Sequence, residues 1–184
     1  MRRKKKGVYA FIDSQNLNVS VQKYGWKMNW KKFRQFLTDE YGVERAFMFI
    51  GYVPEHEDID EKMHEAGYSV VLKPTFDMSR PRPEDNGNKP EKPVKGNVDA
   101  DLVLWAMKEM DNYDKAVLVS GDGDFFALVE YLQQQGRLLK ILTPTGQYSR
   151  LFHQFEEYIE RLDNHRRELA YHDRRPAKKP SPKQ

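Results

Sequence analysis

Residues 118–128 read LVSGDGDFFAL, and this stretch decides the fold that the chain predicts. The apolar run at 116–119 is typical of a buried strand, and the two glycines that follow allow a sharp bend. A helical pattern begins directly afterwards, at 125–135, and ends before a glycine. The stretch therefore predicts a strand that passes through a tight turn into a helix, with Asp122 and Asp124 held in the turn.

Short apolar runs and helical patterns alternate along the rest of the chain. We expect further strands at 8–12, 45–53, 68–73 and 138–142, and helices at 16–23, 30–41, 55–66, 98–110 and 149–170. Strands separated by helices favour a parallel sheet with right-handed crossovers and helices on both faces. The sequence thus predicts an α/β fold, a three-layer α/β/α sandwich with a central, mainly parallel sheet.

The length and composition limit the classes of protein to which the chain can belong. A chain of 184 residues suits one domain, which we place at 7–164, with a proline-rich loop at 74–96 and basic tails at 1–6 and 165–184. The chain has no cysteine, and none of its apolar runs approaches the roughly 18 residues that a membrane span needs. We therefore expect a cytoplasmic protein with no membrane segment.

The charge is divided unevenly between the ends and the body. The two tails hold twelve of the 31 basic residues but only two of the 28 acidic ones. The body keeps 19 basic and 26 acidic residues, so its formal charge is −7 and the ends are strongly positive. Basic ends on an acidic body favour a polyanion as partner, with solvated ends that merely aid solubility as the alternative.

Several aspartates are placed where the strands of the predicted sheet end. Asp13 follows the strand at 8–12, and Asp122 and Asp124 follow the strand at 116–119. Ligands of open parallel sheets bind beyond the carboxyl ends of the strands, where the strand order reverses. If these two strands are neighbours, the three carboxylates face one crevice.

The stretch 95–102, KGNVDADL, adds two more aspartates in a first helical turn. Asp99 and Asp101 are rotated by roughly 200° from each other on a helix, so both cannot face one site equally well. An acidic residue in a first turn also complements the helix dipole, which accounts for one of the two. We favour Asp99 as the inward group, because Gly96 gives the backbone freedom before it, and Asp101 stays open as the alternative.

Clustered carboxylates repel one another unless cations or protons compensate their charge. Oxygen ligands without cysteine, and with the five histidines placed elsewhere in the sequence, indicate Mg²⁺ or Mn²⁺ rather than zinc. Such an ion activates water and neutralises charge on a phosphodiester, so we expect metal-dependent phosphodiester hydrolysis.

Three polar residues near these aspartates are candidates for contacts with the substrate. Asn16 is placed to bond a water molecule or a phosphate oxygen, with a helix cap as the alternative. Ser120 is placed to bond a metal-bound water or a ligating carboxylate, with a turn hydrogen bond as the alternative. Lys95 lies in the basic loop that leads into the second acidic motif, and we include it as a substrate-binding candidate.

The ordered trio FIDSQN, KGNVDADL and LVSGDGDF resembles the NYN domain, the LabA-like branch of the PIN-domain ribonuclease superfamily, over about residues 7–160. The resemblance implies a PIN-like sandwich and a ribonuclease that depends on Mg²⁺ or Mn²⁺. Position by position, it implies a polar partner at Asn16 and metal-binding aspartates at Asp13, Asp99, Asp122 and Asp124. Many relatives lack a residue at the position of Asn97, which leaves the choice between Asp99 and Asp101 open.

Our hypothesis is a metal-dependent ribonuclease that acts on single-stranded RNA. An inactive RNA-binding or regulatory adaptor of the same fold is the alternative. A phosphatase of the haloacid dehalogenase type is disfavoured, because Gln15 stands where its second aspartate is needed. A homodimer would let a partner subunit complete a positive groove. Tyr24 and Trp26 suit either base stacking or packing of their loop, and packing is the favoured interpretation.

Overall fold

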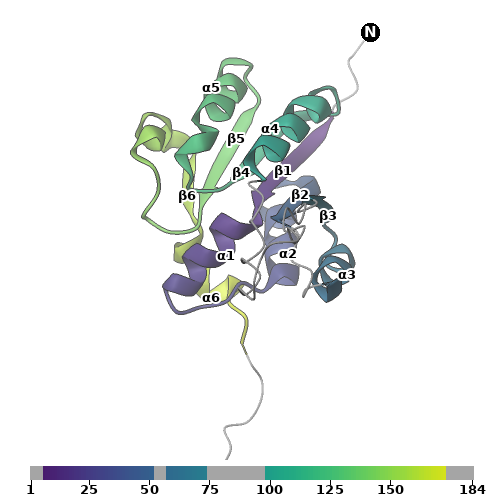
Figure 1. Cartoon of the computed structure of the whole chain (residues 1–184). Coiled ribbons are helices and arrows are strands. Elements are labelled where there is room, and N and C mark those ends of the chain that lie inside the picture. Colours follow the sequence, from purple (N-terminus) through teal and green to yellow (C-terminus); the bar gives the residue numbers. More distant parts are fainter. Residues whose placement is uncertain (1–5, 52–56, 74–97, 173–184) are drawn as a thin grey trace, which may run out of the picture.

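The computed structural model describes residues 6–51, 57–73 and 98–172 (Figure 1). The proline-rich loop expected at 74–96, Lys95 within it, and most of both expected tails lie outside the described residues. Among the residues that the structure describes, no helix is both long enough and apolar enough to cross a membrane.

One sheet organises the described part of the chain. Its order is β3-β2-β1-β4-β5-β6, and every neighbouring pair is parallel. The strands are β1 (Gly7–Asp13), β2 (Val43–Gly51), β3 (Ser69–Lys73), β4 (Tyr113–Val119), β5 (Leu138–Thr143) and β6 (Ile159–Arg161). The chain builds outward from β1 in one direction and from β4 in the other, so the order reverses between these two strands.

Helices connect the strands and cover both faces of the sheet. They are α1 (Ser14–Lys23), α2 (Trp30–Tyr41), α3 (Glu57–Glu65), α4 (Asp99–Lys108), α5 (Phe126–Gln134) and α6 (Arg166–Leu169). Short 3-10 segments lie at η2 (Glu109–Asp111), η3 (Gly123–Phe125), η4 (Arg150–Tyr158) and η5 (Leu162–His165). The expected three-layer α/β/α fold with a parallel sheet is confirmed.

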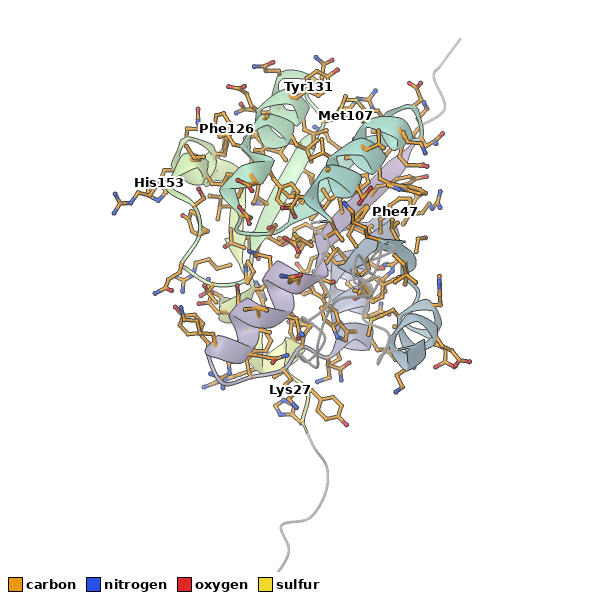
Figure 2. All side chains as sticks on the ribbon, in the orientation of Figure 1. Lys27, Phe47, Met107, Phe126, Tyr131 and His153 are labelled. Atoms are coloured by element: carbon orange, nitrogen blue, oxygen red, sulfur yellow. The ribbon has the colours of Figure 1, made fainter. Side chains whose placement is uncertain are left out.

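Two hydrophobic cores lie on opposite faces of the sheet because the side chains of each strand alternate. Along β1, Ala10 and Ile12 join the core beneath α1, α2 and α6, whereas Tyr9 and Phe11 join the core beneath α4 and α5. Phe47, on the face covered by α4, stacks on Phe11 with ring centroids 5.5 Å apart (Figure 2). Burying each such side chain stabilises the fold by about 1.5–3 kcal/mol.

Trp26 lies in the turn after α1 and is buried, with 6% of its surface exposed, which agrees with the packing role. Tyr24, two residues earlier, is 41% exposed. The favoured packing interpretation therefore fits Trp26, whereas Tyr24 is exposed.

The segment at 149–170 differs from the long helix that the sequence predicts. It folds as η4, the strand β6, η5 and the short helix α6, and Phe155 leaves the helical region with φ −113°. The reason is a parallel pairing of Ile159 with Ile141 on β5, a tertiary contact that overrides the local helical spacing.

The packed structure also continues past residue 164, where the sequence placed the start of the basic tail. Leu169 is fully buried, and its carbonyl oxygen accepts a hydrogen bond from the N–H of Asn29 over 2.8 Å. Ala170 forms an antiparallel bridge with Met28. This stretch therefore closes the core beneath α1 and α2 rather than extending into solvent.

Candidate metal centre

The site forms at the switch point of the sheet, where β1 and β4 run side by side. Ile12 pairs with Val119, so the residues that come next, Asp13 at the end of β1 and Ser120 just after β4, also meet. The Ser120 hydroxyl donates a hydrogen bond to Oδ2 of Asp13 over 3.2 Å, and both side chains are buried. The predicted convergence of the two strand ends is thus present in the structure.

Asp13 is the N-cap of α1 as well as a site residue. Its Oδ1 accepts a hydrogen bond from the backbone N–H of Asn16 over 3.0 Å, which satisfies one of the free donors of the first helical turn. The helix cap that the sequence offered as an alternative role for Asn16 therefore belongs to Asp13.

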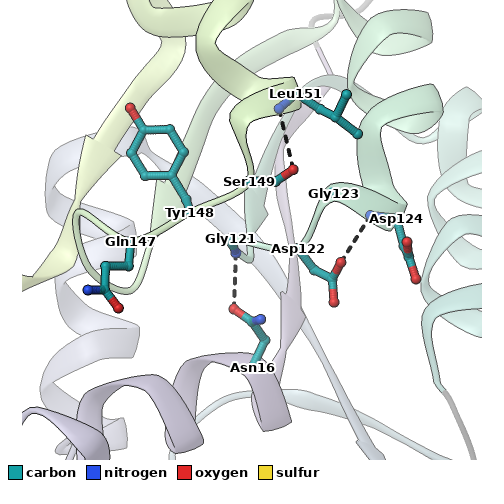
Figure 3. A pocket seen from close by; sticks show the side chains of 9 residues that line it. All are labelled: Asn16, Gly121, Asp122, Gly123, Asp124, Gln147, Tyr148, Ser149 and Leu151. Atoms are coloured by element: carbon teal, nitrogen blue, oxygen red, sulfur yellow. Dashed lines mark hydrogen bonds between the residues drawn. The ribbon is translucent and has the colours of Figure 1, made fainter.

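The loop after β4 is fastened to α1 through the Asn16 side chain. Its Oδ1 accepts a hydrogen bond from the backbone N–H of Gly121 over 3.0 Å (Figure 3). Within the loop, the Ser120 hydroxyl accepts from the N–H of Asp122, and Oδ1 of Asp122 accepts from the N–H of Asp124. These bonds give the two loop aspartates a defined backbone position.

Three aspartates from two distant segments meet beside this loop. Asp99 at the start of α4, Asp122 and Asp124 each offer a carboxylate oxygen, and these oxygens lie within 4.8 Å of one another. Two ligands on opposite sides of one Mg²⁺ ion are about 4.2 Å apart, given metal–oxygen distances of 2.0–2.1 Å. The oxygen-only donor set fits a hard divalent cation, and this grouping contains no histidine. Oxygens that lie up to 4.8 Å apart would have to draw together by a few tenths of an ångström to share one Mg²⁺ ion.

Asp101 takes a different direction from Asp99, as the helical rotation predicts. Its Oδ2 lies 3.2 Å from Nζ of Lys73, at the end of β3. The two side chains remain about one third exposed, so the ion pair contributes little to stability. The structure thus brings Asp99 into the acidic group and turns Asp101 toward β3.

Asp13 is not one of the three clustered aspartates, but the charges of two of them, Asp99 and Asp122, affect its pKa. Burial raises the pKa of Asp13, and the negative charges of Asp99 and Asp122 raise it further. The hydrogen bonds from Asn16 and Ser120 oppose this rise, because they favour the ionised form. A cation at the cluster would relieve the repulsion that these aspartates impose on Asp13.

An open pocket of about 750 Å³ lies beside the cluster (Figure 3). One part of its lining comes from Asn16 and residues 121–124, and the other part from residues 147–149 and Leu151. The residues of the second part form no pattern that indicates a site in the sequence. The only signal was that residues 144–149 follow β5, whose carboxyl end lies at the same edge of the parallel sheet as those of β1 and β4.

The fold and the site together define a class of protein, an α/β/α domain with carboxylates gathered at the switch point of a parallel sheet. The sequence matches the NYN domain over residues 7–169, and the chain belongs to this family, whose members are generally nucleases.

The chain is similar to the low amplitude and bright protein LabA of Synechococcus elongatus, with 25% identity over 158 residues, 83% of this chain and 82% of that protein. A crystal structure of a protein of unknown function from Vibrio parahaemolyticus is similar in fold. Its TM-score is 0.67 at 22% identity, and the match covers 93% of this chain and 100% of the other.

Proposed function

We propose that the protein is a ribonuclease that hydrolyses phosphodiester bonds of single-stranded RNA with the help of Mg²⁺ or Mn²⁺. The observation that carries the proposal is the approach of three carboxylate oxygens, from Asp99, Asp122 and Asp124, within 4.8 Å at the switch point. Membership of the NYN family supports the nuclease class, and the open pocket beside the cluster offers room for a nucleotide.

In this proposal Asp99, Asp122 and Asp124 hold the metal ion, and Asp13 completes the acidic site from the end of β1. A bound divalent ion would supply an activated water molecule and neutralise the charge that develops on the phosphate. Asp122 and Asp124 also line the open pocket, so an RNA backbone in the pocket could reach an ion that they would hold.

Asn16 serves as a hydrogen-bond donor toward the substrate or the attacking water. The N–H of Gly121 requires an acceptor, which fixes the Asn16 oxygen and leaves the amide nitrogen with two hydrogens to donate. Asn16 lines the pocket, so these hydrogens border the space next to the aspartates. An amide takes no proton at neutral pH, so its role is orientation.

The test incubates the purified full chain with labelled single-stranded RNA in Mn²⁺, in Mg²⁺ and in EDTA. We expect cleavage in either metal, none in EDTA and none with Asp122→Asn. Asp39→Asn is the matched control, because Asp39 is an exposed aspartate on α2, away from the site. Cleavage that persists in EDTA and in the Asp122→Asn variant would rule out the mechanism.

Asp13→Asn separates catalysis from folding. Asparagine keeps an oxygen for the N–H of Asn16 and removes a buried carboxyl group whose pKa the site already raises, but its amide nitrogen cannot accept the hydrogen bond from the Ser120 hydroxyl. Because these two effects oppose each other, we expect this variant to lose cleavage while its urea midpoint in EDTA stays close to that of the wild type. RNA that binds to the wild type without being cut would instead favour the adaptor function.

A further inference from the structure

The loop between β5 and η4, residues 144–149, forms a part of the pocket that carries no charge. Gln147, Tyr148 and Ser149 line the pocket from this loop, and Leu151 lines it from the start of η4 (Figure 3). None of these side chains carries a charge that could balance a metal ion or a phosphate. Their amide, phenol and apolar groups suit an uncharged, planar ligand.

This loop is fixed against the loop that carries Asp122. The N–H of Ser149 donates a hydrogen bond to the carbonyl oxygen of Gly121 over 2.9 Å. A Cβ atom on Gly121 would lie 3.3 Å from the Cβ of Tyr148, so the two loops are in close contact. Tyr148 is therefore held at a set position relative to the metal site.

A hydrogen bond between two residues of the loop also stabilises its conformation. Thr145 is buried, and its hydroxyl oxygen accepts a hydrogen bond from the N–H of Gln147 over 3.1 Å. A ligand that binds to this wall thus meets a surface that is already ordered, which lowers the entropy cost of binding.

Tyr148 has the contacts of a stacking platform. Tyr148 is half-buried against the core beneath α4 and α5, and its ring packs against the ring of His153 at 5.8 Å with an interplanar angle of 82°. Leu151, a few residues along, is 52% exposed at the pocket. Tyr148 and Leu151 thus give the pocket apolar lining on two different sides of Ser149, and the Tyr148 ring is directed away from Asp122 and Asp124 (Figure 3).

We infer that Tyr148, with Leu151 and Gln147, forms a subsite that stacks one unpaired nucleobase of the RNA at the neutral side of the pocket, away from the metal centre that the same strand reaches. The inference rests on the proposed function and divides the pocket into an acidic, metal-binding side and a neutral, base-binding side. Gln147 is exposed and bears both donor and acceptor groups for the edge of a base. A base in a duplex is stacked and paired and is not free to enter, so the subsite selects single strands.

The test measures binding of fluorescent single-stranded RNA to the full chain by anisotropy, with Asp122→Asn as the common background so that no substrate is cut. Tyr148→Ala should weaken binding about 5- to 150-fold, the range of one lost base stack, and Tyr148→Phe should bind like the parent. Tyr131→Ala is the matched control, because Tyr131 lies on α5 and is 38% exposed (Figure 2). It should bind like the parent.

A second substrate series removes single bases from the RNA and keeps its backbone. At one position, the base-free RNA should bind equally to the parent and to Tyr148→Ala. An effect of Tyr148→Ala that persists with every base-free substrate, or no effect at all, would overturn the subsite.

These outcomes are distinct from a failure of the proposed function. Cleavage by the wild-type protein with an unchanged KM in Tyr148→Ala would reject the subsite alone. Base-dependent binding without any cleavage by the wild-type protein would reject the nuclease alone.

Discussion

The side-chain oxygen of Asn16 accepts a hydrogen bond from the backbone N–H of Gly121 over 3.0 Å, which joins the first turn of α1 to the loop after β4. The two residues are 105 positions apart in the sequence. The bond spans the switch point of the sheet, so it fixes the loop aspartates relative to Asp13 at the end of β1.

Replacing Asn16 by alanine should reduce both activity and stability. The N–H of Gly121 would lose its partner, at a cost of about 0.5–1.5 kcal/mol in the free energy of unfolding. Cleavage should fall by more than this small loss of stability explains, because the donor toward the substrate is also gone. Asn18→Ala is the control, since Asn18 lies on the same helix and its side chain accepts a hydrogen bond from Gln22 on the exposed surface.

Asp99 and Asp101 should respond differently to substitution by asparagine. Added Mn²⁺ should stabilise the wild type by about 2.7 kcal/mol when its concentration is 100 times the Kd. Asp99→Asn should lose most of this stabilisation, whereas Asp101→Asn should keep it and lose only the ion pair to Lys73. Thermal melts with and without Mn²⁺ measure the effect, and an equal response of the two variants would contradict the assignment of Asp99.

The strand ends were predictable because their signal is local. The run before Asp13 and the run before Ser120 are apolar and short, and a parallel sheet aligns the carboxyl ends of its strands. The rotation between Asp99 and Asp101 follows equally from helix geometry, which is why the sequence could separate their directions. What it could not supply is the ion pair that draws Asp101 toward β3.

The neutral side of the pocket depends on long-range contacts that the local sequence pattern does not predict. Tyr148 borders the site because the N–H of Ser149 bonds to Gly121, some 28 positions earlier in the chain. In the same way, Ile159 joins the sheet only because β5 offers it a free edge. Both features arise from contacts between segments that are distant in the sequence. For Ile159, the pairing with β5 overrides the helical spacing at 149–170.

Gly123→Ala should disturb the site while the fold survives. A Cβ atom at this position would lie 2.4 Å from Oγ of Ser149 and 3.2 Å from Cδ1 of Leu151, so the Ser149 side chain or its loop must shift. Overpacking of this kind costs about 1–3 kcal/mol. We expect reduced cleavage with a modest fall in the melting temperature, and the double variant Gly123→Ala, Ser149→Ala should recover part of the loss. A double variant that is worse than the single one would show that the clash is not the cause.

Glu160 should make the protein sensitive to acid. Its two carboxylate oxygens accept hydrogen bonds, one from the Tyr41 hydroxyl over 2.6 Å and one from Nε2 of His165 over 2.8 Å. Burial alone would raise the pKa of Glu160, but these two hydrogen bonds, with the charges of His165 and Lys140, hold it below its ordinary value.

The direction of this shift fixes the direction of the pH effect. The folded pKa lies below that of the unfolded chain, so the ionised carboxylate stabilises the fold at pH values above the unfolded pKa, about 4.3. The contribution disappears as the pH falls through the folded pKa. Glu160→Gln keeps one acceptor but cannot titrate, so its stability should fall less steeply below pH 5 than that of the wild type. Urea unfolding between pH 7 and pH 3 measures the slopes, with the exposed Glu157→Gln as control. If Glu160→Gln loses stability as steeply as the control, the acid response originates elsewhere in the fold.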